Sequence, residues 1–221
     1  MMIRKTALWV ACMTLACLLW GHSAGAQPQR EPRLSLNGYV KYMSSVMFDE
    51  FDTFWTLDNL LHNRLNIEWH PGESLTFTAG IRNRMMYGDY VKLIPGYAGL
   101  VSRDDGLLHF LTGNLVDSRS MILTTTFDRL NFEYSLGKFD ITIGRQRINW
   151  GQSFVWNPND IFNSYSFFDF DYEERPGSDG VRVRFYPGYT SSLEAAVKAG
   201  RDKNLTAALL YRFNAGGYDL Q

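Results

Sequence analysis

The side chains best suited to chemistry in this sequence are arginines, and two of them stand in an unusual stretch. The segment GRQRINWGQSFVWNPNDIF runs from Gly144 to Phe162 and places Arg145 and Arg147 directly after the strand-like FDITI. Guanidinium groups bind carboxylates and phosphates, so arginines gathered along one wall attract anions. What these arginines do depends on the elements that hold them.

Candidate catalytic residues are sparse. The histidines His62, His70 and His109 show neither helical spacing nor metal-ligand spacing. Asp104 and Asp105 precede His109 closely enough to suggest an acid–base site, but a solvated loop is the favoured interpretation. No phosphate-binding loop or dinucleotide fingerprint is present. The sequence therefore predicts no enzyme, no catalytic residue, no cofactor and no metal site.

Residues 1–26 have the order of a secretory signal peptide. Arg4 and Lys5 precede the apolar run ALWVACMTLACLLW, which ends in the small residues AGA. This order predicts cleavage before Gln27 and export of the chain. The apolar run is short for a retained transmembrane helix of about 20 residues.

Export changes both the thiol content and the charge of the chain. The two cysteines, Cys12 and Cys17, lie in the predicted signal peptide, so we expect neither a disulfide nor a thiol site afterwards. The whole chain has 22 basic and 23 acidic residues, and the signal peptide removes two basic ones. The resulting acidic excess argues against a nucleic-acid partner.

The remainder reads as alternating strands. In NRLNIEWH, Leu65 and Trp69 share one face while Arg64 and Glu68 share the other. The same period of two predicts eight strands, near 34–47, 60–70, 75–87, 121–136, 139–150, 180–187, 192–200 and 204–213. The final GGYDLQ looks like the start of a ninth.

The connections alternate in length. Short turns follow the second, fourth and sixth strands, whereas longer segments such as 88–120 and 151–179 follow the first, third and fifth; the seventh strand is an exception, followed only by a tight hairpin. Transmembrane β-barrels show this asymmetry, with short periplasmic turns and longer outer loops. We therefore predict an all-β fold, an antiparallel transmembrane β-barrel of about eight strands, with a soluble β-sandwich as the alternative. Aromatic residues at strand ends would form the interfacial girdles: Trp69, Tyr87, Tyr134, Trp150, Tyr186, Tyr211 and Phe213.

The predicted organisation follows from these assignments. A signal peptide (1–26) precedes a periplasmic arm (27–33) and a barrel domain (34–221), which is either complete or the front part of a larger barrel. The polar positions would line the lumen: Arg64, Glu68, Arg82, Arg84, Arg129, Asn131, Glu133, Arg182, Arg184, Glu194, Lys198 and Arg212. Such a wall attracts anions if the lumen is wet. In a dry lumen, arginines and carboxylates must instead pair across strands.

The fifth predicted strand raises a phase problem. Alternation from Phe139 onward would turn Arg145 and Arg147 toward lipid. We predict that either a bulge at Gly144 flips the phase or the chain has already reached the polar mouth of the pore. Trp150 would then mark the membrane interface.

A strand-end motif in this stretch is similar to one in a known group. The residues Gly144, Arg145 and Gln146, followed by Asn149, Trp150 and Gly151, resemble the GRQ…WG pattern of Gram-negative porin-like barrels, including the alginate-export type. The likeness is sharpest over 139–186. It implies an outer-membrane barrel with a channel role, without naming a solute, and such barrels commonly have more than eight strands.

The 151–179 loop is aromatic and acidic. Its acidic cluster comprises Asp169, Asp171, Glu173 and Glu174, interleaved with Phe and Tyr. Four interpretations stay open: simple packing over the rim, a constriction of the pore, a cation site and a sugar-stacking surface.

The functional prediction is a porin-like channel in the bacterial outer membrane. It would let small, anionic solutes diffuse passively, with outer-membrane lipid as its other partner. The alternative is a small closed barrel with a filled lumen that serves as an adhesin or anchor through its outer loops. An outer-membrane hydrolase is a third and weaker option.

Overall fold

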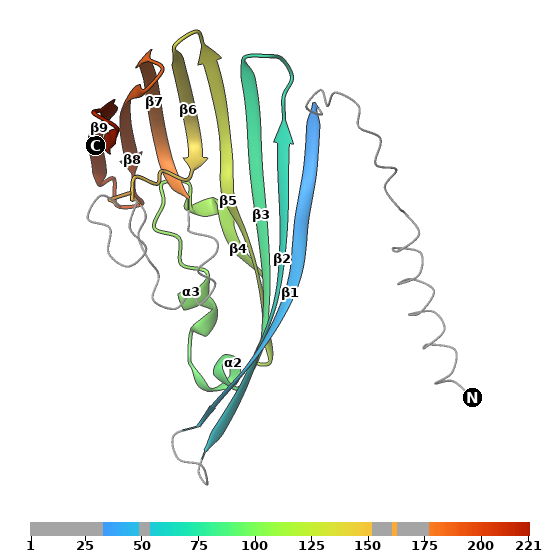
Figure 1. Ribbon diagram of the computed structural model, residues 1–221. Coiled ribbons are helices and arrows are strands. Elements are labelled where there is room, and N and C mark those ends of the chain that lie inside the picture. Colours follow the sequence, from blue (N-terminus) through green and yellow to red (C-terminus); the bar gives the residue numbers. More distant parts are fainter. Residues whose placement is uncertain (1–32, 49–53, 152–160, 163–176) are drawn as a thin grey trace. The chain divides into compact units, whose positions relative to one another are not determined.

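One antiparallel sheet organises the chain. The computed structural model describes residues 33–48, 54–151, 161–162 and 177–221. Its strands are β1 (Leu34–Phe48), β2 (Trp55–Trp69), β3 (Leu75–Gly88), β4 (Thr112–Asp117), β5 (Met121–Leu136), β6 (Phe139–Gln146), β7 (Ser178–Gly188), β8 (Ser191–Ala199), β9 (Leu205–Ala215) and β10 (Tyr218–Leu220). They follow the order β1-β2-β3-β5-β6-β7-β8-β9-β10, and β4 pairs separately with β5 (Figure 1).

The predicted all-β, antiparallel fold is confirmed, and each of the eight predicted strands is present. Two boundaries differ: β2 begins at Trp55, and β6 ends at Gln146 rather than at residue 150. The strand expected to start in GGYDLQ is β10. β4 is not among the predicted strands, because its six residues lie inside the 88–120 segment, for which the sequence predicts a loop.

The sheet does not close into a barrel. Within the described residues, the main strand order ends at β1 and at β10, which do not pair with each other, and β4 pairs with β5 alone. The closed arrangement of about eight strands predicted from the sequence is therefore absent from this part of the chain, which forms an open sheet. The predicted signal peptide and most of the 27–33 arm lie outside the described residues.

The two faces of the sheet differ sharply because strand side chains alternate with a period of two. We call the face that carries Arg64, Arg82, Thr124, Thr142 and Glu194 the polar face, and all five side chains are buried. The opposite, apolar face carries large hydrophobic side chains in the central strands as well as at the edges. Those of Phe132, Ile143 and Leu209 are 53%, 55% and 67% exposed.

The short and long connections lie at opposite ends of the strands. Residues 70–74, 137–138 and 189–190 join strands at the upper end in Figure 1, and the 89–120 connection lies at the lower end. This arrangement agrees with the predicted asymmetry. No helix in the described part of the chain is long and apolar enough to cross a membrane.

The 89–111 segment, predicted as a loop, contains short helices that cover part of the polar face. They are α2 (Asp89–Leu93), α3 (Tyr97–Val101) and η1 (His109–Leu111). Val91 and Val101 pack against Ile122 of β5. Arg84 of β3 fixes α3 by donating from Nη2 to the carbonyl oxygen of Val101 at 2.6 Å.

β5 changes its neighbour halfway along its length. β6 pairs with it only as far as Arg145 opposite Leu130, and β4 takes over from Thr112 opposite Thr126. Between these points β5 carries a bulge at Asp128, where the register with β3 shifts. The irregularity therefore lies on the strand adjacent to the one predicted to bulge.

The predicted bulge at Gly144 is wrong. Both neighbours of β6 keep an uninterrupted register through this residue. Gly144 instead adopts a φ of 115°, which L side chains rarely adopt, and a Cβ there would collide with the carbonyl oxygen of Leu130. Arg145 and Gln146 follow directly after this glycine.

Candidate functional site

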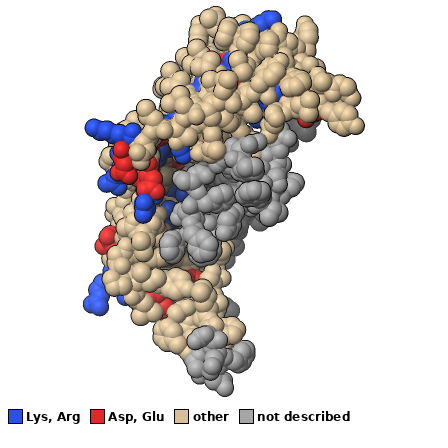
Figure 2. All heavy atoms as spheres, turned by 90° about the vertical axis from the view of Figure 1, so that its left-hand side faces the viewer, with Lys and Arg blue, Asp and Glu red and all other residues tan. Residues whose placement is uncertain are grey.

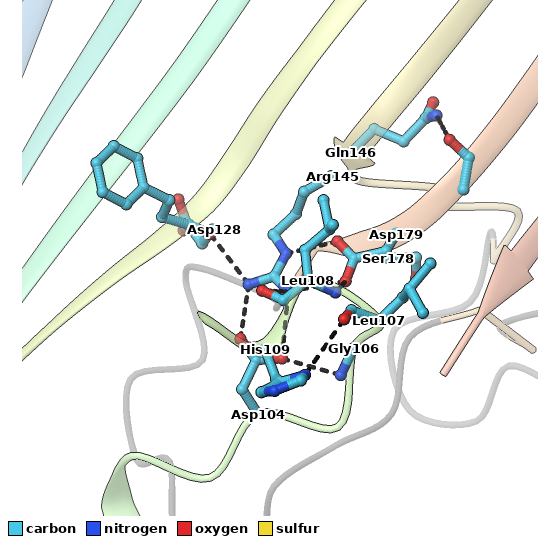
Figure 3. Close-up of polar contacts among 12 residues, drawn as sticks. Asp104, Gly106, Leu107, Leu108, His109, Asp128, Arg145, Gln146, Ser178 and Asp179 are labelled. Atoms are coloured by element: carbon cyan, nitrogen blue, oxygen red, sulfur yellow. Dashed lines mark hydrogen bonds and ion pairs between the residues drawn. The ribbon is translucent and has the colours of Figure 1, made fainter. Parts of the chain in front are cut away.

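Arg145, at the end of β6, makes a dense set of hydrogen bonds to carboxylates and backbone carbonyls. Its Nε and Nη2 donate to the two oxygens of Asp179 at 2.7 and 2.8 Å. Its Nη1 donates to Asp104 Oδ2 at 2.7 Å and to the carbonyl oxygen of Phe127 at 3.2 Å, and Nη2 also reaches the carbonyl of Leu108 at 3.0 Å. All five guanidinium donors are thus used within the protein. Figure 3 shows Arg145 pointing from β6 toward Asp104 and Asp179, and we call these three residues the Arg145 cluster.

The backbone of residues 104–108 closes over this cluster. The N–H of Leu108 donates to Asp179 Oδ2 at 2.8 Å, and the N–H of Gly106 donates to Asp104 Oδ1 at 2.9 Å. A Cβ on Gly106 would overlap Asp179 Oδ2 and lie 2.7 Å from Arg145 Nη2. Only a residue without a side chain allows the backbone to approach this closely.

The charge state of Asp104, which lies outside the strands, follows from its surroundings. Burial by itself raises the pKa of this carboxyl. The hydrogen bonds from Arg145 and from the Gly106 N–H outweigh that effect, so the pKa of Asp104 lies below its ordinary value. Asp104 is therefore ionised at neutral pH and pairs with Arg145 as a charged group.

The 104–108 run also reaches the turn between β8 and β9. Gly106 and Gly200 form an isolated antiparallel bridge, and the N–H of Arg201 donates to the carbonyl of Asp105 at 2.9 Å. The 89–111 segment thus contacts the polar face of β3 and β5 through α3, and it then passes the ends of the shorter strands.

The structure corrects the predicted position of the GRQ…WG motif. Arg145 and Gln146 are 3% and 2% exposed, so neither lies at an open polar mouth. Gln146 Nε2 donates to the carbonyls of Thr142 and Gly180. Arg147 and Asn149 are exposed, and Gly151 is half-buried.

Trp150 is not an interface anchor, contrary to the prediction. It is buried with Ile148 and Phe162 against Ala196, on the polar face of β8. Its Nε1 donates to Glu194 Oε1 at 2.5 Å. After β6 has ended, Ile148 and Trp150 are buried while Arg147 and Asn149 are exposed. The sequence shows the same period of two as apolar residues that alternate with polar ones, and this was the available signal that the chain still follows the sheet. Tyr186 was also assigned to a girdle, but its hydroxyl donates to Asp140 Oδ2 at 3.0 Å and it lies on the polar side.

Phe162, a described residue inside the 151–179 loop, is held on the polar face. The carbonyl of Phe162 accepts from Ser178 Oγ at 2.6 Å and from Lys198 Nζ at 2.7 Å. The acidic cluster of Asp169, Asp171, Glu173 and Glu174 lies outside the described residues, so its predicted roles stay predictions.

A second charged group lies on the polar face of β5, β6 and β7. Arg184 Nη2 is 3.1 Å from Glu133 Oε2 and 3.8 Å from Asp140 Oδ2, and Arg182 Nη2 is 3.8 Å from the same oxygen of Glu133. Thr142 donates to this Glu133 oxygen at 3.0 Å. These predicted pore-lining residues are brought together as ion pairs.

The other predicted pore-lining residues are distributed over the same face. Arg64 forms a buried ion pair with Asp128, and Arg129 Nη1 is 4.0 Å from that carboxylate. Glu68 is half-exposed and pairs with His70 at 3.0 Å. Arg82, Arg84 and Asn131 are buried, whereas Arg212 lies near the β9–β10 edge, with Nε 3.5 Å from Gln221 Oε1.

No acid–base pair forms from the weak candidates. Asp104 binds Arg145, and the Nδ1 of His109 lies 3.3 Å from the carbonyl of Leu107 instead. Within the described ranges, no group of three or more His, Cys, Asp or Glu side chains is arranged to hold a metal ion. Figure 2 shows a largely uncharged face, on which Lys, Arg, Asp and Glu gather mainly in one mixed patch.

The comparisons with known proteins return no relative. No family model, no curated protein and no solved structure matches the chain. The resemblance of the GRQ…WG motif to porin-like barrels therefore stays a prediction from the residues alone.

Proposed function

We propose that this chain forms the wall of a porin-like outer-membrane channel through which small solutes diffuse passively. One observation carries the proposal: charged and polar side chains are buried on one face of the sheet while large apolar side chains stand exposed on the other. A water-soluble sheet protein does the reverse, because burying apolar area is what stabilises it. A strand wall with lipid on one side and a polar interior on the other has this distribution.

The outward apolar face also has the extent of a membrane crossing. Along β2, Trp69 lies near the short-turn end, and Asn59 lies about ten positions away beside Tyr87 of β3. Ten residues at about 3.3 Å each, tilted by about 40°, span about 25 Å, the height of the apolar band of an outer-membrane barrel. Tyr42 donates to Asn59 Oδ1 at 2.6 Å, so this row, at the end of the strands next to the 89–120 connection, is polar and aromatic, as an interface requires.

Two segments would narrow the channel from within. The 89–101 region packs on the polar face of β3 and β5, and the Trp150–Phe162 pair packs on that of β8. The solutes admitted would therefore be small. Arg182 and Arg184, which stay partly exposed beside Glu133, would bias the wall toward anions.

The test is reconstitution of the full chain into planar lipid bilayers and liposomes. The proposal expects discrete conductance steps and swelling of liposomes in isosmotic small solutes. A protein that inserts and resists proteases, yet neither conducts nor permits swelling, would overturn the channel.

That second outcome would favour the alternative, a closed barrel with a filled lumen that acts as an anchor or adhesin. The packing on the polar face supports this alternative. Two hydrophobic clusters and several arginine–carboxylate pairs occupy the polar face, which is the packing that a filled interior needs.

A further inference from the structure

A row of hydrogen-bonded polar side chains crosses the middle of the apolar face. Asn63 of β2, Asn83 of β3 and Thr125 of β5 occupy directly paired positions on three neighbouring strands. Asn83 Nδ2 donates to Asn63 Oδ1 at 3.1 Å, and Thr125 Oγ1 donates to Asn83 Oδ1 at 2.7 Å. Asn63 Nδ2 donates to the carbonyl of Tyr39 on β1 at 3.3 Å. We call Asn63, Asn83 and Thr125 the amide row.

The amide row is surrounded by apolar side chains. The paired positions on its two sides carry Leu61, Met85 and Leu123, and Leu65, Ile81 and Phe127. Residues opposite each other in an antiparallel pair point to the same face, so these flanking rows share the surface with the amides. The row is thus an isolated polar feature.

Its position along the strands is well inside the proposed membrane band. Asn63 lies between Asn59, in the polar row next to the 89–120 connection, and Trp69, near the short turns. By the same rise and tilt, it is about 10 Å from the first level and about 15 Å from the second. An amide at that depth faces hydrocarbon if nothing covers it.

Internal hydrogen bonds do not use all the polar groups of the row. A primary amide has two N–H donors and accepts two hydrogen bonds, and a hydroxyl can also accept. Among the described residues, Asn63 and Asn83 each use one N–H, and the Thr125 oxygen accepts none. An amide N–H left without a partner in hydrocarbon is costly.

We propose that the amide row is the centre of an interface between two copies of this chain in the membrane. The unused groups include both donors and acceptors, so the row is complementary to itself. A two-fold interface places the same patch on both subunits, which lets each row meet the other. Polar side chains contribute to such association between membrane segments. This inference rests on the proposed membrane location.

The experiment combines a cross-link with a loss-of-association variant. The background is the full chain with Cys12→Ser and Cys17→Ser, reconstituted in lipid. Asn83→Cys, at the middle of the row, is expected to form a disulfide-linked dimer under mild oxidation. Phe132→Cys, exposed on the same face away from the row, is the control and is expected to stay uncross-linked.

The association itself is measured by light scattering in mild detergent. The variant N63L/N83L/T125V removes the unused groups and is expected to weaken dimerisation by about tenfold or more. Insertion is followed in parallel by protease resistance in liposomes. Protein that inserts but is monomeric, or that cross-links equally at both cysteines, would overturn the interface alone. Protein that never inserts would overturn the proposed function, and this inference with it.

Discussion

Arg145 and Asp179 face each other across the β6–β7 pair through two parallel N–H···O bonds, and their side chains are only 3% and 2% exposed. This fork geometry is specific to arginine, because lysine presents a single ammonium group. It joins two strands to the 104–108 backbone at the place where β5 exchanges β6 for β4.

Replacing Arg145 should therefore destabilise the protein severely. R145M leaves the carboxylates of Asp104 and Asp179 buried without their cation, and we expect a loss of about 3–5 kcal/mol. R145K should recover only part of this loss. The measurement is denaturant unfolding of the refolded protein in detergent. The control is R103A, whose exposed ion pair with Asp105 should matter little; equal midpoints for R145M and R103A would contradict the prediction.

Gly106 should tolerate no side chain. In G106A the new methyl group meets Asp179 and Arg145, so the 104–108 backbone must withdraw from the cluster. We expect faster proteolysis of the 102–111 region and, in a bilayer, a larger conductance. G113A is the matched control, since a Cβ on Gly113 has nothing within 4 Å. Similar behaviour of the two alanine variants would refute the close approach.

Acid should release the 104–108 backbone. Because the folded pKa of Asp104 is lowered, the stabilisation from its ionised form is present above its unfolded value of about 3.9 and is lost as pH falls through the lower folded value. Protease access to this region should rise below about pH 4. D104N should abolish that step by removing the titrating group. If protease access still rose below about pH 4 in D104N, a group other than Asp104 would be responsible for the change.

Trp150 should report the packing of the loop end on β8. In W150F the buried carboxylate of Glu194 loses its hydrogen bond from Nε1, which should cost about 1–3 kcal/mol. W150F/E194Q should recover part of the loss because no charge is then left unpaired. The free energy of unfolding is compared across the wild type, W150F, E194Q and W150F/E194Q, and additive losses would contradict the coupling.

Charge preference should follow the polar-face arginines if the protein conducts. Neutralising Arg82, Arg84, Arg182 and Arg184 to glutamine should shift selectivity away from anions. The reversal potential in a salt gradient measures the shift, with R119Q in an exposed turn as the control. Unchanged reversal potentials would mean that these arginines act only in ion pairs.

The period of two in the sequence was sufficient to predict the strands other than β4, their order along the chain and the polar and apolar faces of most of them. It gave no information on where β5 would stop pairing with β6 and begin to pair with β4. The side chain of Arg145 is buried by Asp104, 41 positions earlier, and by Asp179, 34 positions later. A contact of that kind leaves no local pattern.

Trp150 shows the same limit at a single residue. An aromatic side chain at a strand end is as suitable for a lipid interface as for an internal cluster, and only the position of Glu194 and Ala196 on β8 decides between them. The helices α2 and α3 were missed because each has five residues, too few to establish a helical period.

The Arg145 cluster also has a consequence for the order of folding. Neighbouring strands such as β7 and β8 are joined by tight turns and can pair early, because the loops to be closed are short. Asp104, Phe127, Arg145 and Asp179 come from four separate parts of the chain, so their contacts require β5, β6 and β7 to be assembled already. Contacts that form after the rate-limiting barrier leave the folding rate unchanged and slow unfolding. The main effect of the cluster would therefore be to slow the unfolding of the assembled sheet.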